Sequence, residues 1–139
     1  MIILDTNVCS ELLKPMPNPA VLTWLQNLSE IPRTTVITRA ELLSGVALLP
    51  DGERKDRLDR GIKQVLSPLG DCLPVNSMAA DYYATIIAKR HRIGRPISGF
   101  DALIAAITKV HNATLATRNV KDFQYLDLVI INPWDTRQN

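Results

Sequence analysis

The chain has 139 residues, of which 46% are hydrophobic and 22% charged, with a formal net charge of +2 at neutral pH. This composition is typical of one soluble globular domain, here residues 1–139, and it excludes a disordered chain or a coiled coil. The charge is too small to demand a nucleic-acid partner, so any basic binding surface has to be local.

Short apolar or β-branched runs alternate with segments of helical periodicity along the whole chain. Strands are predicted at residues 1–4, 34–37, 72–75, 114–117 and 128–131. Helices are predicted at residues 8–13 (with Asn7 as a cap), 20–28, 38–49, 53–66, 77–92 and 99–110. This alternation favours an α/β fold with a mostly parallel sheet. Right-handed crossovers then make a three-layer α/β/α sandwich with about five short strands the leading topology.

The cysteines and the N-terminus indicate where the protein works. Cys9 and Cys72 are the only cysteines and form no Cys-x-x-Cys pair, which is typical of free thiols in a reducing compartment. The opening Met-Ile-Ile-Leu-Asp has no basic segment of a signal peptide, and no run approaches the ~20 apolar residues of a membrane span. We expect a cytoplasmic protein without a membrane partner.

Three acidic residues fall where predicted elements begin or end. Asp5 directly follows the first strand, and ligands of parallel sheets bind beyond such strand ends. Glu41 and Asp101 each lie at the start of a helix, three residues after Thr38 and Ser98 respectively. That spacing is also typical of a capping box, so a purely structural role for these two acids stays open.

The combination of the three acids favours a metal site over helix capping. If Asp5, Glu41 and Asp101 converge on one edge of the sheet, their carboxylates repel one another unless a cation lies between them. Hard oxygen ligands of this kind suit Mg²⁺ or Mn²⁺. Such ions commonly activate water for attack on a phosphate.

Four segments resemble the motifs of PIN-domain nucleases. They are MIILDTNVCSELL (residues 1–13), TRAELLSGVALLP (38–50), GFDALIAAITKVHNATLATRNVKDF (99–123) and INPW (131–134). Each motif is weak alone, but the four occur in order and at suitable spacing. The likeness is to the VapC/FitB type, the toxin half of type II toxin–antitoxin pairs, and it covers nearly the whole chain.

The resemblance implies a metal-dependent endoribonuclease that hydrolyses RNA phosphodiester bonds with Mg²⁺ or Mn²⁺. It also implies a homodimer, or a larger toxin–antitoxin assembly, that a cognate antitoxin neutralises. Carried over by position, Asp5, Glu41 and Asp101 would be the catalytic and metal-binding acids. Asn119 stands where many relatives have a fourth acid, so it would be a weak metal ligand, and the number of bound metals stays open.

Neighbouring residues are predicted to hold the RNA. Substrate-binding candidates are Thr6, Asn7, Arg39, Thr117 and Arg118. The basic residues Lys89, Arg90, His91, Arg92 and Arg95 are further candidates for the rim, although cations at a helix end also complement its dipole. Trp134 follows the last strand and is expected to close an edge of the core.

Two other functions are compatible with the same fold. A PIN-like binding module without catalysis is favoured by Asn119. A phosphatase or phosphoacceptor domain using Asp5 would need further acids near the first strand, and none is evident. The missing Gly-x-Gly-x-x-Gly disfavours a dinucleotide-binding domain, and a P-loop motif is also missing.

Overall fold

Three short apolar runs form a parallel sheet in the computed structural model, which describes residues 1–138. The strands are β1 (Ile2–Leu4), β2 (Thr114–Ala116) and β3 (Val129–Ile131), in the order β1-β2-β3. The helices are α1 (Thr6–Leu12), α2 (Pro19–Gln26), α3 (Val36–Ala47), α4 (Glu53–Leu66), α5 (Ser77–Arg92) and α6 (Gly99–Val110). Short 3₁₀ helices are η1 (Ser67–Leu69), η2 (Val120–Phe123) and η3 (Thr136–Gln138).

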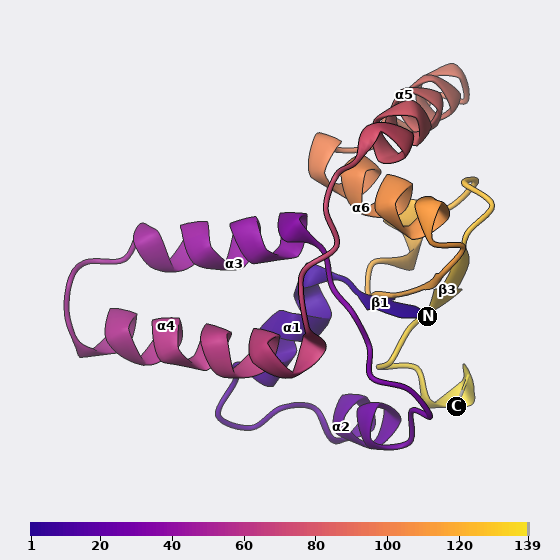
Figure 1. Cartoon of the computed structure of the whole chain (residues 1–139). Helices are drawn as coiled ribbons and strands as arrows, with labels where there is room; N and C mark the ends of the chain where they lie inside the picture. Colours follow the sequence, from indigo (N-terminus) through magenta and orange to yellow (C-terminus); the bar gives the residue numbers. More distant parts are fainter. Residues whose placement is uncertain (139) are drawn as a thin grey trace.

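Helices cover both faces of the sheet. Successive residues of a strand point to opposite faces. Accordingly, Ile3 and Leu115 belong to a core cluster with α5 and α6, whereas Leu4 and Ala116 belong to a second cluster with α1, α2, α3 and α4. Figure 1 shows α5 and α6 on one side of the sheet, α1 and α2 on the other, and the paired α3 and α4 extending outward. The predicted three-layer α/β/α architecture is confirmed.

Two of the five predicted strands are reduced to single bridges. Residues 34–37 and 72–75 contribute one bridge, Thr35 to Leu73, and Arg33 bridges to Ile3. The pairing stops early because Thr35 already caps α3 and because Pro74, which has no N–H, follows Leu73 directly. The prediction of about five strands was therefore too high for residues 1–138.

The predicted bounds of α4, α5 and α6 agree with the structure, but two helix starts were wrong. Asp5, not Asn7, caps α1, and α3 begins at Val36, two residues before Thr38. Within residues 1–138, no helix is long and apolar enough to cross a membrane.

Candidate functional site

The register of the sheet brings Asp5 beside Thr117. Leu4 of β1 pairs with Ala116 of β2, and the Asp5 N–H donates to the Ala116 carbonyl at 2.9 Å. β1 and β2 end at the same edge of the sheet, so the side chains of the next residues, Asp5 and Thr117, meet there. The Thr117 hydroxyl donates to Asp5 Oδ2 at 2.7 Å, and both residues are buried.

Hydrogen bonds hold the Asp5 carboxylate in one orientation. As the cap of α1, Asp5 accepts the Thr6 N–H on Oδ1 at 2.8 Å. The Asn7 amide donates to Asp5 Oδ2 at 3.3 Å and to the Thr117 hydroxyl at 3.2 Å. That hydroxyl also accepts the Asn119 N–H at 3.1 Å. Two strand ends and the first turn of α1 are thus joined through one threonine oxygen.

Thr6 links the first acid to the second. Its hydroxyl donates to Glu41 Oε1 at 2.8 Å and lies 3.0 Å from the Thr38 hydroxyl. The predicted capping box of Thr38 and Glu41 is wrong, because the Thr35 hydroxyl caps α3 by accepting the Thr38 N–H. Glu41 therefore lies in the second turn of α3, with its carboxylate directed toward α1 rather than toward its own helix end.

Asp101 enters the site from α6. The Ser98 hydroxyl accepts the Asp101 N–H at 3.2 Å, so the predicted cap at this helix is confirmed. The cap uses the backbone N–H of Asp101, and its side chain lines the pocket. Partial burial raises the pKa of the Asp101 carboxyl, a hydrogen bond with the Ser98 side chain lowers it, and the charges of Asp122 and Glu41 raise it further.

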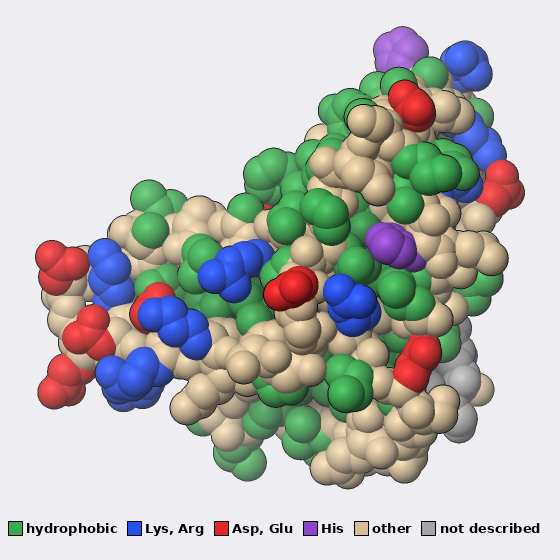
Figure 2. Space-filling view, in the orientation of Figure 1, with side chains coloured by type: hydrophobic (Ala, Val, Ile, Leu, Met, Phe, Trp, Pro, Cys, Tyr) green, Lys and Arg blue, Asp and Glu red, His purple; other side chains and the backbone are tan. Residues whose placement is uncertain are grey.

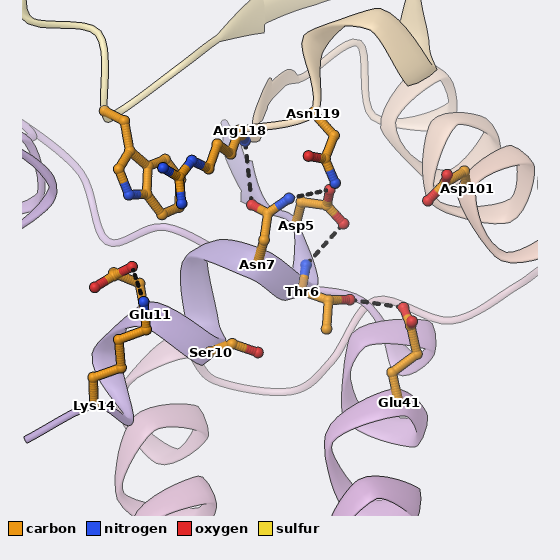
Figure 3. A pocket seen from close by; sticks show the side chains of 11 residues that line it. Asp5, Thr6, Asn7, Ser10, Glu11, Lys14, Glu41, Asp101, Arg118 and Asn119 are labelled. Atoms are coloured by element: carbon orange, nitrogen blue, oxygen red, sulfur yellow. Dashed lines mark hydrogen bonds and ion pairs between the residues drawn. The ribbon is translucent and has the colours of Figure 1, made fainter. Parts of the chain in front are cut away.

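All three acids line one open pocket of about 390 Å³ (Figure 3). The residues around it are Asp5, Thr6, Asn7, Ser10, Glu11, Lys14, Glu41, Asp101, Arg118, Asn119 and Trp134. Figure 3 shows Arg118 and Asp101 on opposite sides of Asp5, with Glu41 below. Arg39 is not brought to this pocket, and instead lines a separate depression with Lys63 and Asp71.

Burial dominates the electrostatics of Asp5. It raises the pKa of the carboxyl to about 6, against the lowering effect of the hydrogen bonds from Thr117 and Thr6. The charges of Asp101 and Glu41 raise the same pKa further. The fold thus keeps a desolvated carboxylate in the field of two others, an arrangement that a cation would relieve.

The donor set suits a hard cation that keeps part of its water shell. Three carboxylates and the Asn119 amide supply oxygen ligands around an open pocket. Within residues 1–138, no three Asp, Glu, His or Cys side chains are gathered tightly enough to enclose an ion by themselves. Mg²⁺ commonly retains several waters and binds one or two carboxylates, so the residues fit such an ion without forming a closed cage.

Four pocket residues were missed as site residues from the sequence: Ser10, Glu11, Lys14 and Trp134. Glu11 is buried and accepts bonds from Lys14 Nζ and the Asn18 N–H, both at 3.0 Å. Ser10, Glu11 and Lys14 follow Asn7 by three, four and seven residues, so helical periodicity places them on the same face as Asn7. Trp134 packs against the second core cluster, as expected of a residue that closes an edge, yet also faces the pocket.

The basic run after residue 88 is not part of the pocket rim. Arg90 is buried, and its guanidinium donates to the carbonyls of Arg95 at 2.6 Å, Asp122 at 2.7 Å and Gln124 at 3.3 Å. The Arg95 side chain lies over the Tyr125 ring. For Arg90, the expectation of a rim role is corrected: its donors are used to hold loops.

Comparison with known proteins gives consistent matches. Residues 2–127 match the PIN domain family. The chain is 42% identical to Toxin FitB of Neisseria gonorrhoeae, covering 96% of this chain and 99% of the relative. It is 39% identical to VapC ribonuclease Y4jK of Sinorhizobium fredii, covering 97% and 99%. The crystal structure of VapBC2 from Rickettsia felis bound to a promoter DNA fragment superposes with a TM-score of 0.84 at 27% identity, covering 97% of this chain and 100% of that chain.

Proposed function

Because this chain belongs to the PIN domain family, we propose that it is a metal-dependent endoribonuclease and the toxin of a toxin–antitoxin pair. Relatives named as a toxin and as a ribonuclease, each aligned over nearly its full length, support this activity. The observation that carries the proposal is that Asp5, Glu41 and Asp101, which come from three separate parts of the chain, line one pocket.

We assign the binding of Mg²⁺ or Mn²⁺ to Asp5 and Asp101, directly or through water, with Asn119 as a weaker neutral donor. A bound ion supplies charge stabilisation at the phosphate and an acidified water. Thr117 and Asn7 fix the orientation of Asp5 through the bonds described above. The protein contribution is therefore a preoriented carboxylate that does not have to reorganise when substrate arrives.

Glu41 completes the site and positions the attacking water. Its Oε1 accepts the Thr6 hydroxyl, and the carboxylate lines the pocket, where it can accept a proton from water. The water oxygen forms a bond to phosphorus as Glu41 takes its proton. The bond from phosphorus to the 3′ oxygen breaks and that oxygen takes a proton from solvent, so the products carry a 5′-phosphate and a 3′-hydroxyl. Thr6 is a positioning residue, because it acts on the reaction through Glu41.

Cations beside the acids would attract the RNA backbone. Arg118 and Lys14 line the same pocket as the carboxylates, and Arg118 is exposed. Phosphate contacts of this kind supply affinity without sequence information. They allow a pocket rich in acids to bind a polyanion once an ion has neutralised the carboxylates.

Two protein partners follow from the same proposal. A cognate antitoxin would neutralise the enzyme by covering the pocket, where an arginine would pair with the carboxylates. A homodimer is supported by apolar side chains on α5 and α6, which Figure 2 shows on the surface. Met78 and Phe100 there are 53% and 52% exposed.

The direct experiment is cleavage of single-stranded RNA by the purified chain with Mg²⁺ or Mn²⁺. Parent protein is expected to cleave, and Asp5→Asn to lose at least ~100-fold in rate, since removal of one charge-stabilising group costs that much. Ser29→Ala, a substitution in the exposed turn after α2, is the matched control. Equal rates for parent and Asp5→Asn would contradict the assignment.

The alternative of an inert binding module is favoured by Asn119 and by the open arrangement of the acids. Thermal unfolding with and without Mn²⁺ distinguishes the inert module from a metal-dependent catalytic site. An ion that binds only the folded state raises the melting temperature, by an amount that corresponds to about 2.7 kcal/mol at a hundred times its Kd. A catalytic site is expected to show this rise in the parent and to lose it in Asp101→Asn. No rise in the parent would favour the inert module.

A further inference from the structure

We propose that Trp134 and Arg118 form a stacking site for one nucleobase of the RNA, beside the carboxylate pocket. The inference rests on the proposed ribonuclease function and adds, to the attraction of Arg118 for the RNA backbone, a contact with a base outside the acidic cluster. Trp134 was expected only to close the core. Four features of the structure support the wider role.

The backbone after β3 presents Trp134 in a fixed turn. The Asn132 side-chain oxygen accepts the Trp134 N–H at 3.0 Å, and the Asn132 carbonyl accepts the Asp135 N–H at 3.0 Å. Pro133 lies between them, at the position where its fixed φ favours such a turn. The turn follows the carboxyl end of β3, the same edge of the sheet from which Asp5 and Thr117 enter the pocket.

The indole ring is held in place on the pocket wall. One part of it packs against the second core cluster. Lys14 and, more weakly, the Trp134 side chain lower the pKa of the Glu11 carboxyl, so the indole lies near that carboxylate. A ring that packs on the core loses little entropy when a ligand stacks near it.

The Arg118 guanidinium lies over that ring. Its guanidinium carbon lies 5.2 Å from the centroid of the Trp134 ring, within the range of a cation–π contact. The backbone N–H of Arg118 donates to the Asn7 side-chain oxygen at 3.2 Å, which fixes where the side chain begins. The side chain is exposed and has no salt bridge with residues 1–138, so the outer face of the guanidinium is open.

Bases of single-stranded RNA stack on aromatic rings and on guanidinium planes. The Trp134 ring and the guanidinium over it offer both kinds of surface near the site. The Arg118 side chain begins next to Thr117, whose hydroxyl donates to Asp5 and accepts the Asn119 N–H. A base there would belong to a nucleotide adjacent to the cleaved phosphate. Recognition of phosphate alone would need neither the ring nor a planar cation, because a lysine would serve.

The test compares a short single-stranded RNA of mixed sequence with an abasic oligomer of the same backbone. Binding is followed by fluorescence anisotropy with Ca²⁺ in place of Mg²⁺. Parent is expected to bind the base-containing RNA about tenfold more tightly or better, in line with the contribution of one stacked base. Trp134→Leu and Arg118→Lys are expected to bind both oligomers equally, and Trp134→Phe to keep part of the preference.

Arg95→Lys is the matched control, because the Arg95 guanidinium carbon lies 5.4 Å from the centroid of the Tyr125 ring, away from the pocket. It should behave like the parent. Folding of each variant is checked by its melting temperature. Should Trp134→Leu fail to fold, Arg118→Lys decides, because it keeps the charge and the fold.

Three results would overturn the inference. One is an unchanged base preference in folded Trp134→Leu or in Arg118→Lys. Another is an equal loss of affinity for both oligomers in Arg118→Lys, which would make Arg118 a phosphate contact only. The third is weaker antitoxin binding with base preference intact, which would make the surface a protein contact. A parent that neither binds nor cleaves RNA would instead contradict the proposed function itself.

Discussion

Asp5 is only 4% exposed, yet its carboxylate accepts hydrogen bonds from Thr6, Asn7 and Thr117. These bonds lower its pKa, and burial raises it more, so that the carboxyl titrates at about 6 instead of 3.8. Burial therefore disfavours the ionised form of Asp5 at the site where a cation would be bound. Metal binding and protonation compete for this carboxylate, so metal affinity should fall as the pH drops through about 6.

The raised pKa predicts how stability depends on pH without metal. A carboxyl with a higher pKa in the folded state binds its proton more tightly there, so protonation favours folding. The contribution is full below about pH 4 and is lost as the pH rises through about 6. Asp5→Asn, which carries no charge, is expected to be more stable than parent near neutral pH, by at most about 3 kcal/mol. The difference should vanish toward pH 4.

Urea unfolding in EDTA across this pH range measures the free energy of unfolding of both proteins. The difference between parent and variant removes the contribution of carboxyls whose pKa is shifted the other way, such as Glu11. A difference that does not change with pH would show that Asp5 is not the group responsible.

Thr117 is the second residue with a predicted effect. Its hydroxyl donates to Asp5 and accepts from Asn7 and Asn119, so Thr117→Val leaves Asp5 without its strongest hydrogen bond. Activity is expected to fall about 10- to 100-fold, as for other groups that orient metal ligands. The acidic limb of the pH–rate profile should move to higher pH. Thr117→Ser keeps the hydroxyl and should retain both the rate and the profile; equal losses in the two variants would indicate a packing effect.

At the scale of elements, Arg90 connects the end of α5 to the loop that precedes α6 and to the segment that follows β2. Its buried guanidinium satisfies the carbonyls of Arg95, Asp122 and Gln124, which belong to two loops. Gly94, at a φ of +71°, lets the chain reverse after α5 so that Arg95 comes within reach. The cation acts as an internal connector because one planar group can donate to several acceptors.

Replacing this connector should affect stability rather than RNA binding. Arg90→Lys is expected to lower the free energy of unfolding by about 2–3 kcal/mol, since buried carbonyls lose charged donors. Arg92→Lys, at an exposed position on the same helix, should change it by less than about 0.5 kcal/mol. Chemical denaturation of both variants gives the comparison. Similar stabilities for the two would contradict the structural role of Arg90.

Helices were predictable where local signals decide their ends. The bounds of α4 and α6 agree with the sequence because Gly52 and Ser98 mark clear starts and because the apolar periodicity is strong. The start of α3 was missed because Thr35 and Thr38 are both suitable caps, and a tertiary choice, the Thr6 contact to Thr38, selects between them. The strand at residues 34–37 was overpredicted because its β-branched residues also suit an extended segment with one bridge, and the strand at residues 72–75 because Pro74 stops its pairing.

At the scale of the whole molecule, the pocket lies where the two core clusters meet the sheet edge. α1 and α3 bring Asp5 and Glu41 from one side of the sheet, and α6 brings Asp101 from the other. Asp5 and Asp101 were predictable because a strand end and a helix start are local features, whereas Glu41 lies in the second turn of α3 and contacts Thr6. Trp134 could not be found from local features, because only the turn after β3 brings it to the pocket.

Rates of RNA cleavage by single and double variants of Asp5, Glu41 and Asp101 test most directly whether residues so far apart in sequence work as one unit. Groups that act together give strongly non-additive losses. Asp5→Asn should therefore abolish most of the metal-dependent rate, and adding Asp101→Asn should reduce it little further. The proposal would be contradicted if the loss of rate in the double variant equals the product of the losses in the two single variants. It would also be contradicted if the double variant is as active as the parent.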